Sequence, residues 1–142
     1  MAIDFRRVRY KELKSPQKEA YNFQKISALL ADFGYSTIRL SDDWNGADFI
    51  AQHHDGNVFL KVQLKSRLTF SKKYKDKELM VCFRVGEKWF LYPHDELLEK
   101  VIAEGLMEGT KSWDERGGYH FPQLSKRLKE LLEPYRVPST LE

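Results

Sequence analysis

Apolar residues recur at helical spacing in a segment near the start of the chain. The segment opens with Ser15-Pro16, a pair typical of an N-cap and a first helical position, and closes with Gly34, a typical helix stop. The apolar positions between them lie three or four residues apart, at Phe23, Ile26, Leu30 and Phe33. This pattern predicts a helix that packs one apolar stripe on a sheet.

Strict alternation of apolar and polar residues follows this helix. The clearest run covers residues 58–66 and predicts a strand that buries Val58, Leu60, Val62 and Leu64. Asp55-Gly56 before it is a turn signal of the hairpin type, and Gly86-Glu87 is a later turn signal. Shorter runs predict further strands at residues 35–40, 47–53, 79–85 and 89–92. The runs together predict a central sheet of about five strands.

The last third of the chain returns to helical spacing. Residues 95–103 and 122–133 predict helices, whereas residues 71–77 and 105–118 predict an exposed lysine-rich loop and an irregular segment. We expect one domain, because 142 residues suffice for one core and are few for two. Its expected parts are a basic N-terminal arm at 1–14, a core at 15–92, C-terminal helices at 93–133 and a loosely held tail at 134–142.

Composition fits a folded protein. Apolar residues make up 42% of the chain and aromatic residues 13%, which argues against disorder. No apolar run reaches the length that a bilayer requires and no basic-then-apolar leader is visible, so we expect a cytoplasmic protein without a membrane segment. The single Cys82 stands in an apolar run and is expected to be buried, without a catalytic role.

Positive charge is concentrated in two stretches, although the net charge is only +3. The first is the N-terminal arm, with Arg6, Arg7, Arg9, Lys11 and Lys14. The second lies between residues 61 and 77 and contains Lys61, Lys65, Arg67, Lys72, Lys73, Lys75 and Lys77. Clustered cations suit a phosphate backbone, whereas the alternative is a solvated loop and a solvated arm.

Three polar residues form a candidate metal and phosphate site. Gln63 and Lys65 stand two residues apart and therefore share the strand face opposite the apolar positions, while the preceding strand brings Asp48 beside them. Hydrolysis of a phosphodiester needs an activated water and a cation that offsets the growing phosphate charge, and oxygen-bound Mg²⁺ supplies both. Asp48 is a hard anionic ligand, and Lys65 can orient the water or neutralise the phosphate.

The order of helix, strand, strand, turn and strand, with Gly46-Ala47-Asp48 and Gln63-Leu64-Lys65, resembles the PD-(D/E)XK phosphodiesterase superfamily in its variant with Gln in the acidic position. The resemblance covers residues 15–92. It implies an α/β protein of the restriction-endonuclease-like fold, with an αβββ core, a central mixed sheet of about five strands, flanking helices and further C-terminal helices. It also implies a metal held by Asp48 and Gln63, with Lys65 beside the attacked phosphate.

The resemblance leaves the remaining metal ligand open. Many members of the superfamily place a Glu of the first helix in the site, and both Glu19 and Asn22, three residues apart, can occupy that place here. Asp42 and Asp43 are another source of negative charge, although adjacent acids in a turn are more often turn formers. A neutral Gln63 binds Mg²⁺ less strongly than a carboxylate, so the site needs such a further ligand.

The function expected from these features is Mg²⁺- or Mn²⁺-dependent DNA endonuclease activity on duplex or branched DNA. A homodimer or higher oligomer is expected, because cutting both strands calls for two sites. The alternative is a catalytically inactive DNA- or partner-binding module with the same fold. The residues expected to approach the DNA are Lys61, Arg67, Lys72, Lys73 and, in the loop before Asp48, Trp44.

Overall fold

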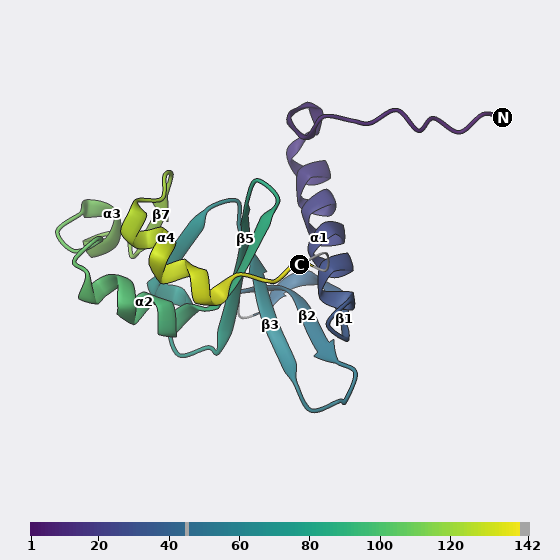
Figure 1. Cartoon of the computed structure of the whole chain (residues 1–142). Coiled ribbons are helices and arrows are strands. Elements are labelled where there is room, and N and C mark those ends of the chain that lie inside the picture. The colour runs from purple at the N-terminus through teal and green to yellow at the C-terminus, as the bar shows by residue number, and fades with distance from the viewer. Residues whose placement is uncertain (45, 140–142) are drawn as a thin grey trace.

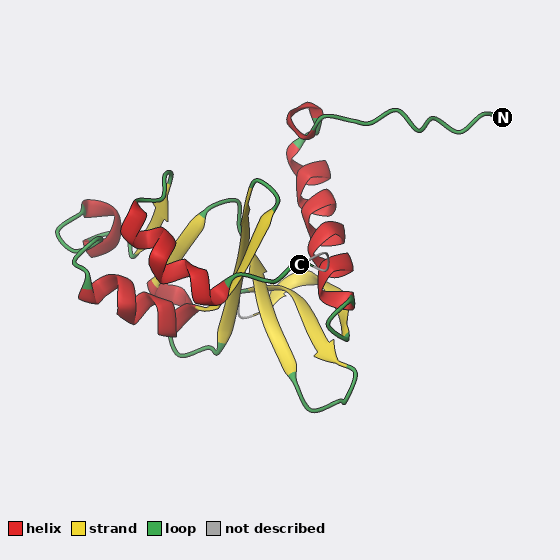
Figure 2. Ribbon diagram, viewed as in Figure 1, coloured by secondary structure: helices red, strands yellow, loops and turns green. Residues whose placement is uncertain are grey.

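Helices flank a central sheet on both sides in the computed structural model of the chain (Figure 1). The structure describes residues 1–44 and 46–139, with residues 42–44 described by their backbone alone. Helix α1 (Ser15–Ala31) lies on one side, and α2 (His94–Ala103) and α4 (Lys126–Leu132) lie on the other (Figure 2). The segment before the short helix that begins at Tyr10 extends away from the body.

The central sheet has five strands in the order β1-β2-β3-β5-β6. β3 and β5 pair in parallel and the other neighbours pair antiparallel, so the sheet is mixed. The strand bounds are β1 (Tyr35–Trp44), β2 (Ala47–His53), β3 (Phe59–Leu64), β5 (Leu79–Val85) and β6 (Lys88–Pro93). The predicted α/β class, with a mixed five-stranded sheet between helices and an α1-β1-β2-β3 order, is confirmed.

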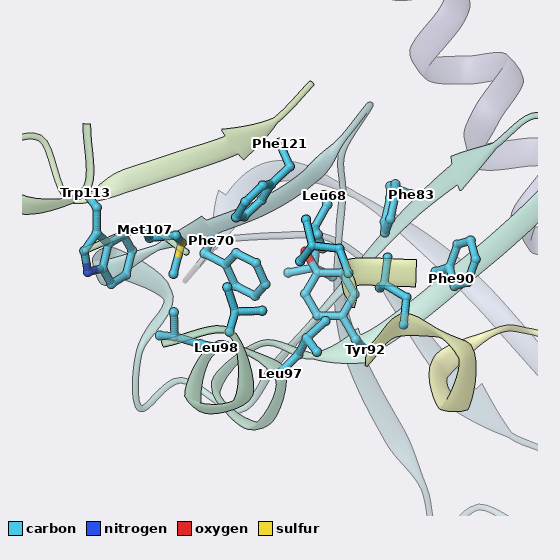
Figure 3. Packing of buried hydrophobic residues seen from close by; sticks show 14 residues of the cluster. Leu68, Phe70, Phe83, Phe90, Tyr92, Leu97, Leu98, Met107, Trp113 and Phe121 are labelled. Atoms are coloured by element: carbon cyan, nitrogen blue, oxygen red, sulfur yellow. The ribbon is translucent and has the colours of Figure 1, made fainter. Parts of the chain in front are cut away.

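Alternation along β5 and β6 divides the core in two. Cys82 and Trp89 pack on the α1 side with Ile26 and Leu30 of that helix. The neighbouring residues point to the other side, since successive side chains of a strand alternate. There Val81, Phe83, Phe90 and Tyr92 join Leu97 and Leu98 of α2 in a larger aromatic cluster (Figure 3). Burial of both faces accounts for the nearly continuous apolar run of β5.

A second, two-stranded sheet extends this aromatic cluster and was missed from the sequence. β4 (Leu68–Ser71) pairs antiparallel with β7 (Gly118–Phe121), and Phe70 and Phe121 both pack in the cluster. The loop predicted at 71–77 is therefore wrong in part. It begins with the end of β4, and the short helix η2 (Lys72–Tyr74) buries Tyr74. Likewise α3 (Lys111–Asp114) occupies the segment predicted to be irregular.

Several predicted boundaries shift by a few residues. Lys14, not Ser15, is the N-cap of α1, and its N–H donates to Gln17 Oε1 at 2.8 Å. Phe33 lies past the end of the helix and is 38% exposed. Val58 is 39% exposed rather than buried, because it precedes β3 in the hairpin loop. Strand β1 is four residues longer than predicted, and α4 begins at Lys126 rather than Pro122.

The C-terminal segment is held more firmly than predicted. After η3 (Glu133–Tyr135), Arg136 forms a bridge with Phe90, and the Val137 N–H donates to the Trp89 carbonyl at 2.9 Å. Lys100 Nζ donates to the Tyr135 hydroxyl at 2.6 Å. Residues 134–137 therefore form part of the packed structure.

The expected burial of Cys82 is confirmed. Cys82 is fully buried, and burial raises the pKa of its thiol well above the ordinary value, which fits a structural side chain. Within the described part of the chain, none of the helices combines the length and apolar character needed to cross a membrane.

Candidate functional site

The residues predicted to form the site line one cavity. This cavity, of about 530 Å³, lies between the N-terminal half of α1 and the ends of β1, β2 and β3. Its α1 residues are spaced three and four apart and therefore share one helix face. The lining consists of Tyr10, Ser15, Lys18, Glu19, Asn22, Phe23, Arg39, Leu40, Asp48, Gln63, Leu64, Lys65 and Ser66.

Asp48 is anchored beside β3. Phe49 pairs with Val62 across β2 and β3, which places Asp48 opposite Gln63. The Leu64 N–H donates to Asp48 Oδ2 at 2.7 Å, so the carboxylate is bonded to the strand that carries the Gln-x-Lys sequence. A carboxylate that accepts a backbone N–H makes a strong, directed bond. The two halves of the predicted motif are therefore joined directly.

Gln63 and Asn22 both line the cavity, and each carries a buried amide oxygen. Gln63 is only 7% exposed, and neither its Oε1 nor Asn22 Oδ1 receives a hydrogen bond from any described residue, although both atoms are shielded from solvent. We call these two oxygens the acceptor pair. A buried acceptor without a donor costs about 1–3 kcal/mol, so such atoms are rare unless a water or an ion completes them.

The acceptor pair makes the cavity suitable for a hard divalent cation. Mg²⁺ takes oxygen ligands, and the pair lies in the same lining as the carboxylate of Asp48. Glu19 also lines the cavity, but its side chain is 73% exposed and Oε2 lies 4.0 Å from a guanidinium nitrogen of Arg39. Of the two helix residues left open by the sequence, Asn22 thus has the buried acceptor oxygen, and Glu19 faces Arg39 and solvent.

Lys65 supplies positive charge at the end of β3. Its N–H donates to the Cys82 carbonyl at 2.8 Å, which continues the parallel pairing with β5 beyond the strand. The ammonium nitrogen lies 5.8 Å from the ring centroid of Tyr74, a buried residue of η2. The backbone of Lys65 is therefore fixed by the sheet, its ammonium group lies near an aromatic ring, and the residue lines the cavity.

The residues predicted to approach DNA differ in their surroundings. Arg67, Lys72 and Lys73 are exposed, and the ammonium groups of the two lysines lie over the rings of Trp113 and Tyr74. Lys61 is engaged within the fold, since its Nζ donates to the Lys77 carbonyl at 2.6 Å. The side chains of Trp44, Asp42 and Asp43 lie outside the described residues.

His120 is a neighbour of the site that the sequence did not reveal. It pairs with Thr69 across β4 and β7, and its Nδ1 lies 2.9 Å from Thr69 Oγ1. The Thr69 hydroxyl donates to the Arg67 carbonyl, so His120 Nδ1 must donate to Thr69. Partial desolvation lowers the pKa of His120, and the charges of Lys65 and Arg67 lower it further. The pairing of β4 with β7 is what brings His120 close to Lys65 and Arg67.

The sequence also did not single out Tyr10, Lys18 and Arg39 as cavity residues. Lys18 and Arg39 could have been predicted to line the cavity, because the regular spacing of α1 places Lys18 and strand alternation places Arg39. Tyr10 carried none, since it stands in a segment marked only by its charge.

Comparisons with known proteins leave the family open. The chain matches no protein-family model and no curated protein. Similar solved structures include Hjc, a Holliday junction resolvase from the archaeal hyperthermophile Archaeoglobus fulgidus, at 17% identity over 52% of this chain and 76% of that chain, with a TM-score of 0.42. The bacterial homing endonuclease I-Ssp6803I is 13% identical over 80% of this chain and 79% of that chain, with a TM-score of 0.46. At these identities and TM-scores, neither likeness establishes the function of this chain.

Proposed function

We propose that the protein is a Mg²⁺- or Mn²⁺-dependent DNA endonuclease of the PD-(D/E)XK type. The observation that carries the proposal is the convergence of Asp48, Gln63, Lys65 and Asn22 on one cavity of about 530 Å³ that also contains the acceptor pair. A carboxylate and two amide oxygens can hold a hard divalent cation, and an ammonium group beside them can stabilise the negative charge of a phosphate.

Asp48, Gln63 and Asn22 are the residues that would hold the cation. A bound divalent ion offsets negative charge on the phosphate and lowers the pKa of a water molecule. Asp48 contributes the anionic oxygen and is kept in place by its bond to the Leu64 N–H. Gln63 and Asn22 contribute the acceptor pair, which is already desolvated.

Lys65 acts on the phosphate side of the reaction in this proposal. Its ammonium group can donate to a non-bridging phosphate oxygen or to the attacking water, and either bond strengthens as negative charge develops. Around it, the exposed Arg67, Lys72 and Lys73 would bind the backbone of duplex or branched DNA, which is the sequence-independent part of DNA affinity. A homodimer or higher oligomer, which sedimentation of the protein on DNA would reveal, would cut both strands.

Cleavage of supercoiled plasmid and of a four-way branched duplex tests the proposal. We expect nicked and linear products with Mg²⁺ or Mn²⁺ and none with chelator. Asp48→Asn keeps an acceptor for the Leu64 N–H, and Lys65→Ala leaves the backbone bond to Cys82 intact, so both should fold. Each should lower the cleavage rate by about 100-fold or more. Lys129→Ala, an exposed change on α4, is the matched control and should cleave at the wild-type rate.

One observation favours the alternative of an inactive DNA- or partner-binding module. Among the residues that the structure describes, no group of three His, Cys, Asp or Glu side chains is arranged to hold a metal ion. The alternative predicts DNA binding that is equal in the wild type, Asp48→Asn and Lys65→Ala. Equal binding, together with intact plasmid under every divalent ion tried, would replace the proposed enzyme with this module.

A further inference from the structure

Tyr10 lies beside the residue whose role the sequence left open. It belongs to the short helix η1 (Tyr10–Glu12), which precedes α1, and it lines the cavity together with Asn22. Asn22 Nδ2 donates to the Tyr10 hydroxyl at 2.8 Å. In this arrangement the NH₂ end of the Asn22 amide is occupied by the Tyr10 hydroxyl, and Oδ1 is the end left to form the acceptor pair with Gln63 Oε1.

The Tyr10 ring is itself fixed by cations and by a second ring. The guanidinium carbon of Arg84, a β5 residue, lies 4.6 Å from the Tyr10 centroid and 5.3 Å from the Tyr21 centroid. Lys18 Nζ lies 5.3 Å from the Tyr10 centroid, and the two tyrosine rings are 5.5 Å apart. Contacts of this kind are attractive when the cation lies within about 6 Å of the ring centroid. Tyr10 is thus tied to both the central sheet and α1.

We infer that Tyr10 is a positioning residue for the metal site, acting through Asn22. This inference rests on the proposed function and deepens it. A neutral amide oxygen is a weaker ligand than a carboxylate, so its contribution depends on how well it is oriented before the cation arrives. Partners that orient a ligand from behind typically change metal affinity by about 10- to 100-fold when they are removed. The N-terminal arm therefore contributes an orienting side chain to the metal site, in addition to its positive charge.

Tyr10→Phe tests the inference, because it removes the hydroxyl and keeps the ring with its cation contacts. We expect the dissociation constant for Mn²⁺, measured by calorimetric titration of the full chain without DNA, to rise by about 10-fold. The metal-free protein should remain folded with at most a small fall in melting temperature, since the ring packing is retained and one part-buried hydrogen bond is lost. Tyr21→Phe is the matched control from the same group of rings and should bind Mn²⁺ as the wild type does.

A double variant tests whether Tyr10 acts through Asn22. If it does, Tyr10→Phe combined with Asn22→Ala should bind Mn²⁺ no more weakly than Asn22→Ala alone. Wild-type affinity in Tyr10→Phe, or a loss that adds to that of Asn22→Ala, would overturn the inference while Asp48→Asn still abolished binding. If the wild type binds no Mn²⁺ and Asp48→Asn changes nothing, the proposed function and the inference are both wrong.

Discussion

The aromatic cluster and the cavity differ in how their buried polar groups are bonded. On the α2 side, the Tyr92 hydroxyl donates to the Thr69 carbonyl at 2.6 Å and accepts the Thr69 N–H at 3.2 Å. In the same region both nitrogens of the buried His94 are bonded, one to the Ser71 N–H and one to Asp95. In the cavity beside the N-terminal half of α1, by contrast, the lining residues Gln63 and Asn22 carry the acceptor pair, which receives no hydrogen bond from a described residue.

This difference separates a structural region from a candidate functional one. Buried polar groups with complete hydrogen bonds hold a fold in one arrangement, as Tyr92 does where it joins β4 to the central sheet and His94 does where it joins β4 to α2. A buried acceptor that the described protein atoms leave incomplete lowers stability, and is expected where a ligand completes it. The aromatic cluster therefore stabilises the molecule, and the cavity is where we propose that the chemistry takes place.

The largest effect on stability should come from the aromatic side. Phe70 is fully buried and contacts the rings of Tyr92, His94 and Phe121, so Phe70→Ala should lower the free energy of unfolding by about 3–5 kcal/mol. Phe59→Ala is the matched control, because Phe59 is 61% exposed and its loss should change stability by less than about 0.5 kcal/mol. Urea unfolding measures both. Equal effects would mean that the aromatic cluster does not stabilise the fold.

A single hydroxyl tests the role of completed hydrogen bonds on that side. Tyr92→Phe keeps the ring but deprives the Thr69 N–H and carbonyl of their partner. We expect a loss of about 1–3 kcal/mol in the free energy of unfolding, since both backbone groups stay buried. Burial raises the pKa of the Tyr92 hydroxyl well above its ordinary value, so the bond should persist at alkaline pH. An unchanged urea midpoint would contradict the comparison.

Replacing a buried polar group of the cavity, unlike Tyr92→Phe, should not lower the free energy of unfolding. Gln63→Leu replaces an amide of the acceptor pair with an apolar group of similar size, so the metal-free protein should be as stable as the wild type or up to about 1 kcal/mol more stable. The same variant should lose the rise in melting temperature that Mn²⁺ gives the wild type. Gln52→Leu, an exposed position of β2, should keep that rise. A destabilised Gln63→Leu would show that Gln63 is structural.

The pH dependence of stability should show a smaller effect, which arises from the buried His94. Burial lowers the pKa of His94 in the folded protein, with Lys75 acting in the same direction and Asp95 against it. As the pH falls, His94 therefore takes up a proton near pH 6.5 in the unfolded chain but only at a lower pH in the folded chain. The contribution of His94 is complete above that pH and is lost as the pH falls through the lowered pKa. Urea midpoints of His94→Gln should fall less steeply with acid than those of the wild type, and parallel curves would contradict this account.

Local pattern was enough to predict most of the central sheet. The bounds predicted for β2 and β5 agree with the structure, because alternating or continuous apolar runs end there at turn residues such as Gly86. The small sheet was missed, since β4 and β7 are four residues long and depend on pairing between distant segments. The C-terminal contacts of Arg136 and Val137 with β6 were missed for the same reason.

The candidate site, like the fold, was predictable where it depends on local pattern and not where it depends on contacts between distant segments. Strand alternation and order were enough to bring Asp48, Gln63 and Lys65 to one cavity. The choice between Glu19 and Asn22 was not predictable, because both lie on the same helix face and differ only in burial and in their partners, Arg39 for Glu19 and Tyr10 for Asn22. The contact with Tyr10 depends on the path of the N-terminal arm, which the spacing of its charged residues does not describe.

Anomalous diffraction from a crystal soaked in Mn²⁺ tests the central claim most directly. The account predicts a manganese peak in the cavity, within coordination distance of the Asp48 carboxylate, Gln63 Oε1 and Asn22 Oδ1, with Lys65 Nζ on the side open to substrate. A peak elsewhere with this cavity empty, or ordered waters that complete the acceptor pair without a metal, would contradict it.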